Sequence, residues 1–414
     1  MMSLPRRLLR PVAFLVSVAV IWLSACSVGP TVDKSYTIVT VFPVSGPASV
    51  IGQSMQHAVD LAVQQNAKLA HGYTLTVSHV DESSDSVRQD IQKLAANSHT
   101  LAVVGPMGSE AAVAIIPIIE QNGLTTISPT AMLPGLTQQD QAAAEGLTFS
   151  KLHPQGKPVA FFRIPATDSV AGKLAADTAV ATAQAHGLAA RSVFIVDDGT
   201  PSGKALASSF SQELKAKHGT IAGQQSLAQG QQNTTRAAVT AIIRANPDLV
   251  FFAGGIAGGA QLRRMLTLSG APGLTILTAG AAAGDPGWSA AVGVVPAAAN
   301  TVALLPASDL STLSNAKNFV SAYQSAYSGE AASPAIALAY DAAMDEIAAI
   351  KAMAASGKAP TRAGVLSAVA STKYSGVSGT FSFNAQGDNT TPPDFSLYTC
   401  DIKGAWTYET SLHS

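Results

Sequence analysis

Short apolar runs alternate with amphipathic stretches along most of the chain, and this alternation constrains the fold more than any other feature. Residues 36–42 (YTIVTVF) are rich in β-branched side chains, and residues 52–69 follow with apolar residues close to helical spacing. The pattern restarts with a strand-like run at 161–164 and a helical stretch at 169–186. Alternating β and α units with near-continuous apolar strands predict parallel sheets that helices cover on both faces.

The whole chain can be divided in this way. The predicted strands of the two sets lie at residues 36–42, 73–80, 101–104, 125–128, 161–164, 192–196, 221–226 and 249–252. The predicted helices lie at residues 52–69, 84–97, 109–121, 169–186, 202–217, 234–245, 261–269, 315–327, 334–353 and 361–370. Residues 379–409 read as β-rich, and the polar residues 138–158 as a surface insertion. A chain of 414 residues with two such sets predicts two domains.

The N-terminus has the features of an export signal. Three arginines within the first ten residues precede the apolar residues 11–23, which are too few and too one-sided for a membrane span. Small residues before Cys26 resemble a bacterial lipobox, which implies cleavage there and a diacylglycerol on the thiol. Residues 1–25 then form a lipoprotein signal peptide and 26–35 a lipidated cysteine with its tether. The alternative is an uncleaved anchor that happens to end in a cysteine.

Composition excludes some classes of protein. The net charge is −1, and −4 without residues 1–25, so the chain lacks the basic footprint of a nucleic-acid-binding protein. Only 12% of residues are charged. Hydrophobic residues make up 47% of the chain, and this share is ample for large cores. The only other cysteine is Cys400, so acylation of Cys26 would leave no intramolecular disulfide. We expect Cys400 to be buried, and stability to come from packing.

Motifs of catalysis and cofactor binding are missing. The eight histidines lack metal-ligand spacing, and neither a CxxC nor a GxSxG pattern occurs. Residues 199–204 (GTPSGK) are one residue short of a phosphate loop, and Ala205 replaces its magnesium-binding Ser or Thr. The glycine cluster at 255–259 has no acid about 20 residues further on to bind a ribose. We therefore expect no enzyme, no cofactor and no metal site.

The candidate site lies where strands end and helices begin, because ligands of open parallel sheets bind there. Residues 105–110 (GPMGSE) leave one predicted strand and open a helix, where free N–H groups and the Ser109 hydroxyl suit an anion. Residues 128–132 (SPTAM) leave the next strand, and their N–H groups could reach the same anion. The alternative is that Ser109 is only a helix cap and Thr130 only part of a turn.

Five segments in the same order resemble the branched-chain amino-acid-binding proteins of ABC importers. They are residues 42–52, 105–112, 127–137, 162–163 and 339–342. The resemblance covers essentially everything after residue 36. It implies the type I periplasmic-binding fold, in which two doubly wound α/β lobes with parallel sheets close on a ligand like a Venus flytrap.

We expect three hinge crossings in such a fold. They should fall near residues 164–168, 304–308 and 372–379. Lobe 1 would then contain residues 36–163 and 307–372, and lobe 2 residues 164–306 and 373–410.

The resemblance also implies which residues contact the ligand. A ligand carboxylate would be held by the Ser109 hydroxyl and by the loop that contains Thr130, Ala131 and Met132. Met132 stands where the family usually has a threonine, so only its backbone donor is retained.

Lobe 2 would close with Ser202, Ile256 and Asp285. Aromatic residues that are common in the family at three cleft positions are replaced here. The replacements are Ile51, Ser202, and Ile256 with its neighbour Gly255.

The acid that pairs with the ligand ammonium should fall near residues 280–284, where this chain has Gly-Ala-Ala-Ala-Gly. A buried unpaired charge costs several kcal/mol, so either Asp285 substitutes through a shifted loop or the ligand is not a free α-amino acid. Tyr340 either lies near the cleft or belongs to the core.

The expected function is capture of a small amino-acid-like or carboxylate ligand for an ABC permease, by a monomer anchored to the bacterial cell membrane outside the cytoplasm. One alternative is a ligand-sensing or regulatory lipoprotein on the same fold. A periplasmic hydrolase would need a nucleophile–base pair, which the sequence does not offer. A DNA-binding regulator of similar fold is excluded by the export signal and by the lack of an N-terminal DNA-binding helix pair.

Overall fold

The computed structural model describes residues 33–185, 192–228, 231–280, 287–293 and 295–413. The chain divides into two compact units, Met1–Lys34 and Ser35–Ser414, and every helix and strand described below belongs to the second. Within the described ranges no helix combines the length and the apolar character that crossing a membrane requires. The predicted signal peptide and Cys26 lie outside the described residues.

Five strands form the first sheet, and all of them are parallel. Their order is β2-β1-β3-β4-β5, which is a doubly wound order with its switch point between β1 and β3. The strands are β1 (Ser35–Phe42), β2 (Thr74–Asp81), β3 (Thr100–Val104), β4 (Thr125–Ser128) and β5 (Phe161–Arg163). The predicted parallel α/β class is confirmed for this half of the chain.

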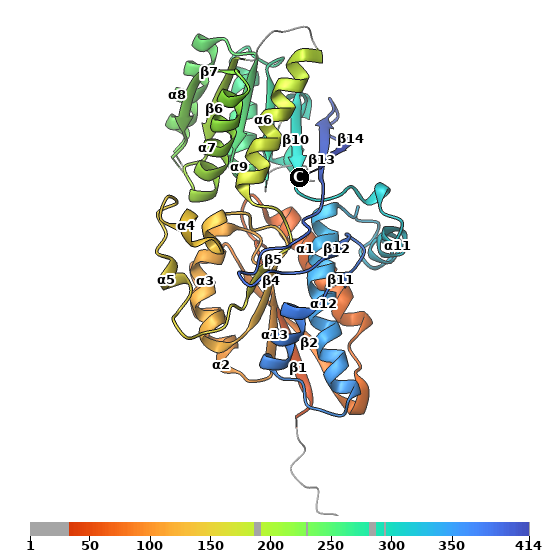
Figure 1. The fold of residues 1–414 in the computed structure, drawn as a ribbon. Coiled ribbons are helices and arrows are strands. Elements are labelled where there is room, and N and C mark those ends of the chain that lie inside the picture. The colour runs from red at the N-terminus through yellow and green to blue at the C-terminus, as the bar shows by residue number, and fades with distance from the viewer. Residues whose placement is uncertain (1–32, 186–191, 229–230, 281–286, 294, 414) are drawn as a thin grey trace, which may run out of the picture. The chain divides into compact units, whose positions relative to one another are not determined.

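Side-chain alternation along β1 explains why helices cover both faces of this sheet. Ile38 and Phe42 point into one core, and Val39 and Val41 into the core on the other face. The first core is closed by α1 (Ser49–Gln65), α11 (Ala316–Ala326), α12 (Pro334–Ala355) and α13 (Arg362–Ser371), and the second by α2 (Val87–Ala96) and α3 (Ser109–Asn122). Figure 1 shows α12 beside α1.

Seven strands form the second sheet, in the order β14-β13-β10-β9-β8-β6-β7. They are β6 (Ser192–Asp197), β7 (Thr220–Ser226), β8 (Leu249–Ala253), β9 (Thr275–Ala279), β10 (Thr301–Leu305), β13 (Phe395–Cys400) and β14 (Trp406–Leu412). The strands from β6 to β10 are parallel, but β13 pairs antiparallel with both β10 and β14. The sheet is therefore parallel with an antiparallel edge, which the sequence pattern alone did not reveal.

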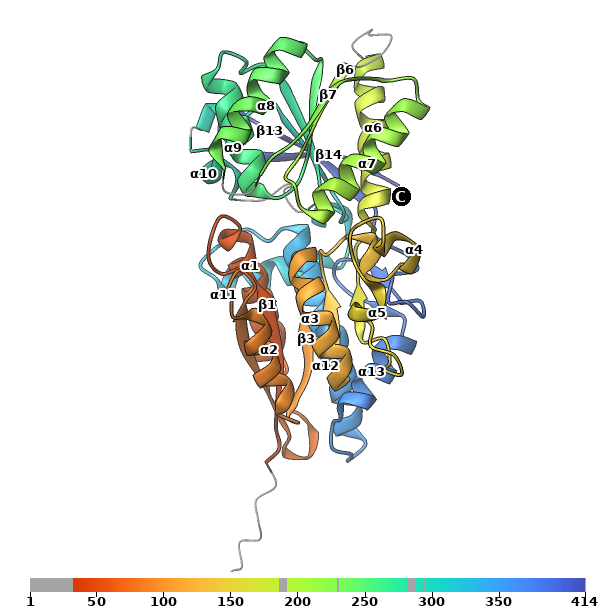
Figure 2. The ribbon, with the colours of Figure 1, turned by 90° about the vertical axis from the view of Figure 1, so that its left-hand side faces the viewer.

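Helices also cover both faces of the second sheet. They are α6 (Asp168–Ala185) and α7 (Pro201–Ala216) on one face, and α8 (Gln232–Ala245) and α9 (Ile256–Leu268) on the other, as Figure 2 shows. Phe251 stacks on Phe210 of α7 with ring centroids 3.8 Å apart, whereas Phe252 enters the opposite core. Adjacent aromatic residues of β8 thus fill both cores.

The chain passes between the two sheets after β5, after β10 and before β13. The first passage falls near the predicted residues 164–168. The second follows β10, which runs to Leu305, so the predicted crossing at 304–308 begins inside a strand.

The predicted crossing at 372–379 is wrong. β11 (Tyr374–Ser375) and β12 (Thr380–Phe381) pair with each other, and Phe381 joins the core of the first sheet. Phe383, two residues further on, packs in a tilted arrangement against Phe162 with ring centroids 4.9 Å apart. Burial of these rings keeps the chain with the first sheet until the segment before Phe395.

A buried arginine links two of these passages. Arg163 is fully buried at the end of β5, where its Nε donates to Asp388 at 2.6 Å and a terminal nitrogen donates to the Leu133 carbonyl at 2.6 Å. Asp388 also accepts from Thr137 and Gln138. Burial opposes ionisation, but the Arg163 guanidinium and the hydrogen bonds outweigh it and hold the pKa of Asp388 below its ordinary value. This network joins the end of β5 to the segment that leads into β13.

The segment predicted as a surface insertion, 138–158, lies on the surface of the first half of the chain, and within it only Ala142 and Leu152 are buried. It contains the short helices α4 (Gln139–Ala142) and α5 (Phe149–Leu152), and Leu152 is buried in the core with α2 and α3. His153 bonds to the buried Glu120 at 2.8 Å. The buried Leu152 and the pair of His153 with Glu120 therefore hold in place a segment whose sequence has no clear helical or strand periodicity.

Helix α12 carries buried carboxyl groups. Asp341 accepts from the backbone N–H groups of Val377 at 3.0 Å and Ser378 at 2.7 Å. Glu346 is fully buried, and neither of its carboxyl oxygens has a hydrogen-bond partner within the described structure. Burial, with a smaller effect from Asp345, raises the pKa of Glu346 well above its ordinary value of 4.5.

The substitution Glu346→Gln should therefore stabilise the protein more at pH 8 than at pH 5. The folded state keeps a proton on Glu346 that the unfolded chain loses above pH 4.5, so the wild type loses stability as the pH rises. Urea unfolding at both pH values measures the difference, with the exposed Glu409→Gln as the control. If the free energy of unfolding of E346Q exceeded that of wild type by the same amount at pH 5 and at pH 8, this account would be contradicted.

Candidate functional site

A cavity of about 610 Å³ lies where the carboxyl ends of both sheets meet. The first sheet contributes the loops after β1, β2, β3 and β4, and the second contributes the loops after β6, β8 and β9. Two doubly wound sheets place their ligand-binding edges here, as the strand-end rule predicts. The volume is in the range of pockets that hold small organic molecules, which is about 300–1,000 Å³.

Five of the predicted site residues line this cavity. They are Ser109, Thr130 and Met132 from the first sheet, and Ser202 and Ile256 from the second. The structure thus brings together residues that are up to 147 positions apart, because each of them follows a strand end.

Three other predicted residues are not among the described residues that line the cavity. Ile51 is buried in the core that α1 shares with β1, since the first turn of α1 turns it inward. Ala131 is buried with α2 and α3, and its N–H donates to the Ser128 hydroxyl at 2.9 Å. Tyr340 packs on the core and donates to Gln65 of α1 at 2.7 Å. Asp285 lies outside the described residues.

The predicted anion donors bind to one another. The Ser109 hydroxyl oxygen accepts from the N–H groups of Met132 at 3.2 Å and Leu133 at 3.1 Å. Thr130 donates its hydroxyl to the Met107 carbonyl at 2.9 Å. These bonds tie the loop after β4 to the loop after β3, and they use the Met132 N–H and the Thr130 hydroxyl, which lie in the loop that was expected to hold a ligand carboxylate.

Glu82 occupies the start of α3. Its two carboxyl oxygens accept from the N–H groups of Met107 at 2.6 Å and Gly108 at 2.7 Å. A helix N-terminus is a good anion site, and here a carboxyl group of the chain itself occupies it. Burial raises the pKa of Glu82 to about 8, with Glu110 and Asp81 adding to the effect and the two N–H donors opposing it.

Asp198 organises the second sheet's side of the cavity. One carboxyl oxygen accepts from the Thr200 N–H at 3.0 Å and hydroxyl at 2.6 Å, and the other accepts from the Gly255 N–H at 2.8 Å. A β-carbon at position 254 would lie 2.5 Å from this carboxyl group, so Gly254 permits the close approach. The loops after β6 and β8 are therefore held together by one carboxylate.

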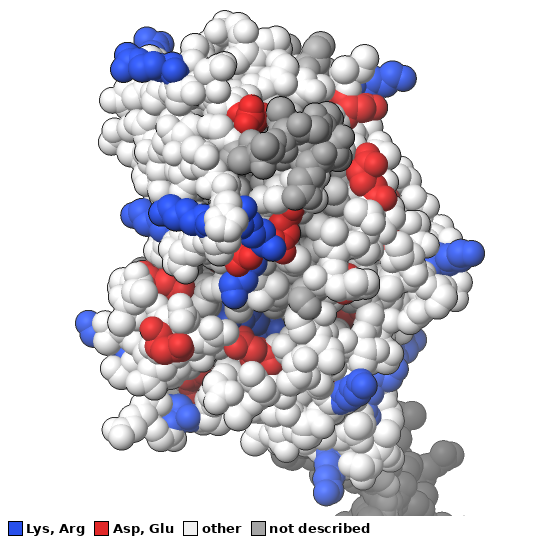
Figure 3. Space-filling view, turned by 45° about the horizontal axis from the view of Figure 1, so that its top comes forward, with Lys and Arg blue, Asp and Glu red and all other residues white. Residues whose placement is uncertain are grey.

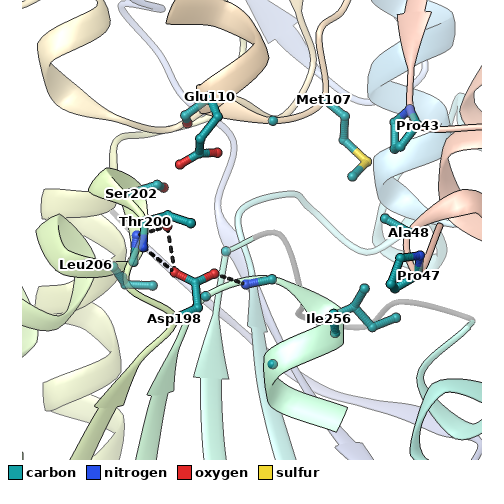
Figure 4. A pocket seen from close by; sticks show the side chains of 18 of the residues that line it. Pro43, Pro47, Ala48, Met107, Glu110, Asp198, Thr200, Ser202, Leu206 and Ile256 are labelled. Carbon is teal, nitrogen blue, oxygen red and sulfur yellow. Dashed lines mark hydrogen bonds between the residues drawn. The ribbon is translucent and has the colours of Figure 1, made fainter. Parts of the chain in front are cut away.

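Two further acids face the same space. Asp168 is buried at the start of α6 and accepts from the Ser202 hydroxyl at 2.6 Å; burial raises its pKa to about 7. Glu110 extends from α3 toward Thr200 and Ser202, as Figure 4 shows. Burial and the nearby Asp198 raise the pKa of Glu110. Acids from both sheets thus converge on one cavity.

Basic side chains do not balance these acids. The described residues that line the cavity include four carboxyl groups and no Lys, Arg or His. Charge is sparse elsewhere too: Figure 3 shows a face that is mostly uncharged, with small separate groups of basic and acidic side chains. The cavity therefore carries a concentrated acidic character on a weakly charged protein.

The remaining wall is apolar. Met107, Pro47, Ala48 and Ile256 lie together on the side of the cavity opposite Glu110 and Thr200, as Figure 4 shows. A ligand here would meet carboxyl groups on one side and hydrocarbon on the other.

The sequence did not single out these acids as site residues, although the strand-end rule places them. Glu82 directly follows β2, Asp198 directly follows β6, and Asp168 opens α6 after β5. The only acid expected at the site was Asp285, the substitute for the ammonium-binding acid of the family. Among the described residues no group of three or more His, Cys, Asp or Glu side chains could hold a metal ion.

Known proteins resemble this chain in both sequence and fold. Residues 35–405 match the model of a family described as periplasmic binding protein. The Leu/Ile/Val-binding protein BraC3 of Rhizobium johnstonii is 25% identical over 249 residues, which are 59% of this chain. The chain spans 61% of the length of that relative.

Solved structures share the fold. The branched-chain amino acid binding protein LivJ of Streptococcus pneumoniae, in complex with isoleucine, is 21% identical with a TM-score of 0.74, and the match covers 92% of this chain and 99% of LivJ. A solute-binding protein of R. palustris in complex with benzoate is 19% identical with a TM-score of 0.73, over 92% and 96% of the two chains. The two-lobed architecture expected from the sequence is thus confirmed.

The substitution Ser109→Ala should lower the free energy of unfolding by about 1–3 kcal/mol in the absence of any ligand, because two buried N–H groups would lose their acceptor. Urea unfolding measures the change. The control is Ser208→Ala, an exposed serine of α7 whose loss should change the stability by less than about 0.5 kcal/mol. If S109A were as stable as S208A, the hydroxyl would not hold the two loops together.

Proposed function

The chain belongs to the periplasmic binding protein family, and from this we propose that it is an extracytoplasmic solute-binding protein of an ABC importer. It captures a small organic molecule in the cavity between its two sheets and presents it to a membrane permease. The observation that carries the proposal is the cavity of about 610 Å³ at the carboxyl ends of both sheets. No catalytic role is proposed.

Hinge closure is the proposed mechanism. Lobe 1 comprises residues 36–163 with 307–389, and lobe 2 comprises 164–306 with 395–410; this moves the third crossing of the predicted division. Ligand binds first to the loops of lobe 1 that carry Ser109, Thr130 and Met132, and lobe 2 then closes over it with Ser202 and Ile256. A few residues at the end of each element absorb such a rotation. The ion pair of Arg163 and Asp388 keeps two crossings together during the motion.

The ligand class expected from the sequence was an amino acid or another carboxylate. It agrees with the names of similar proteins, which mention leucine, isoleucine, valine and benzoate. The acidic lining of the cavity does not favour a carboxylate at the predicted position.

Membrane attachment through Cys26 is proposed from the lipobox pattern, with the protein acting as a tethered monomer outside the cytoplasm. A lipid anchor would keep the binding protein near its permease and so raise the local concentration of the binding protein at the membrane.

A thermal-shift screen tests the binding function. Aliphatic amino acids, amines, short carboxylates, aromatic acids and sugars form the panel, and at least one class should raise the melting temperature. A ligand at about 100 times its Kd adds about 2.7 kcal/mol of stability. The variant Ala257→Trp fills the cavity from α9 and should abolish the shift, whereas Ala237→Trp, on the exposed face of α8, should leave it unchanged. A folded protein that no class stabilises would favour a sensor or scaffold role instead.

Fractionation of bacterial cells tests the anchor. Wild-type protein should sediment with the membranes, and Cys26→Ser should move it to the soluble extracytoplasmic fraction. Cys400→Ser is the matched control and should stay with the membranes, because Cys400 is buried in β13. Membrane association of C26S would contradict lipidation at this residue.

A further inference from the structure

The carboxyl groups of the cavity have no cationic partner in the described lining. Glu82 and Glu110 come from the first sheet's side, and Asp168 and Asp198 from the second sheet's side. A carboxylate that is enclosed in a cavity without a cation nearby is energetically unfavourable. The carboxyl groups of such a site therefore either stay partly protonated or bind a cation.

Glu82 excludes a ligand carboxylate from the place where the sequence predicted one. The N–H groups of Met107 and Gly108 already donate to Glu82 at 2.6 and 2.7 Å. The N–H of Met132 donates to Ser109, and the Thr130 hydroxyl donates to a backbone carbonyl. A ligand carboxylate at the start of α3 would have to displace Glu82 from these two N–H groups and break the bond from Met132, so the protein itself occupies this part of the predicted anion subsite.

The opposite ends of the cavity suit an amphipathic cation. Glu110 and Asp198 approach the same space from the two lobes, as Figure 4 shows, and the carboxyl of Glu110 has its nearest polar neighbours in Thr200 and Ser202. Met107 and Ile256 present hydrocarbon across the cavity. An ammonium group between the two carboxylates would place an attached aliphatic chain against this wall.

We propose, on the premise that the cavity is the ligand site of the proposed function, that its ligand is an aliphatic amine without a carboxylate. The ammonium group lies between Glu110 and Asp198, and the carbon chain lies against Met107 and Ile256. Glu82 stays on the start of α3 and takes the place that a ligand carboxylate would otherwise fill. A bound ammonium group would offset the burial that raises the pKa values of Glu110 and Asp168, and would so favour their ionised forms.

Isothermal titration calorimetry on the full chain tests the proposal. The probes are α,ω-diaminoalkanes from diaminobutane to diaminooctane, hexylamine, 1,6-hexanediol, L-leucine and benzoate. At least one amine should bind, and it should bind more tightly than leucine and benzoate. The diol, which has the same carbon chain without charge, should not bind. Tighter binding of leucine or benzoate than of every amine would overturn the inference, although the proposed binding function would stand.

A single variant assigns the ammonium position. Glu110 lines the cavity from an exposed position of α3, and its carboxyl lies near Thr200 and Ser202. Glu110→Gln keeps the size of this side chain, so we expect the variant to fold and to bind the best amine at least about tenfold more weakly. The control is the exposed Glu409→Gln, which should bind like the wild type. Equal affinity of E110Q and E409Q would overturn the assignment of Glu110.

Absence of binding by every amine would also overturn the inference, because these are the probes that four carboxyl groups should hold best. The proposed function would then depend on the thermal-shift panel and on the cavity-filling Ala257→Trp. If a sugar or an aromatic acid stabilised wild type but not A257W, the proposed binding function would stand and the proposal of an amine ligand would not. The two proposals can therefore fail separately.

Discussion

Parallel pairing is the constraint on which the rest of this structure depends. In a parallel sheet every strand ends at the same edge, so the loops after β1, β2, β3 and β4 converge at one place and those after β6, β8 and β9 at another. The chain passes three times between the sheets and brings these two edges together around one cavity. The side chains that line the site are brought together by the meeting of the two sheet edges, and not by closeness in sequence. The ligand chemistry is then decided by which side chains happen to follow a strand.

Much of the fold could be predicted from local periodicity. The predicted strand at residues 125–128 coincides with β4, and the helix predicted at 109–121 ends one residue before α3 does, because buried apolar runs and helical spacing are properties of neighbouring residues. What failed depended on distant contacts. No strand was predicted at β10, and the predicted crossing at 304–308 overlaps its last two residues, because pairing with β9 and β13 is what makes this segment a strand. The third crossing was placed too early because the short β11 and β12 stay with the first sheet through contacts of Phe381 and Phe383 with residues far away in sequence.

The chemistry of the site differs from what the sequence suggested. Ser109, Thr130 and Met132, to which the strand-end rule pointed, line one cavity with Ser202 and Ile256, which the family resemblance added. The strand-end rule could not show that Glu82, 25 residues before Met107, would reach the start of α3 and accept its N–H groups. A donor is available to a ligand only if nothing else in the fold accepts from it, and that depends on tertiary structure. The result is a family scaffold whose anion subsite is filled by the protein and whose remaining polar wall is acidic.

The most direct test of this account is a crystal structure of the protein with diaminohexane. The account predicts the ligand in the cavity between the sheets, with one nitrogen within hydrogen-bond distance of the carboxylates of Glu110 or Asp198. Glu82 should still accept from the N–H groups of Met107 and Gly108 in that complex. A structure in which Glu82 has left these groups, or in which a co-purified carboxylate occupies its place while the amine is absent, would contradict the account.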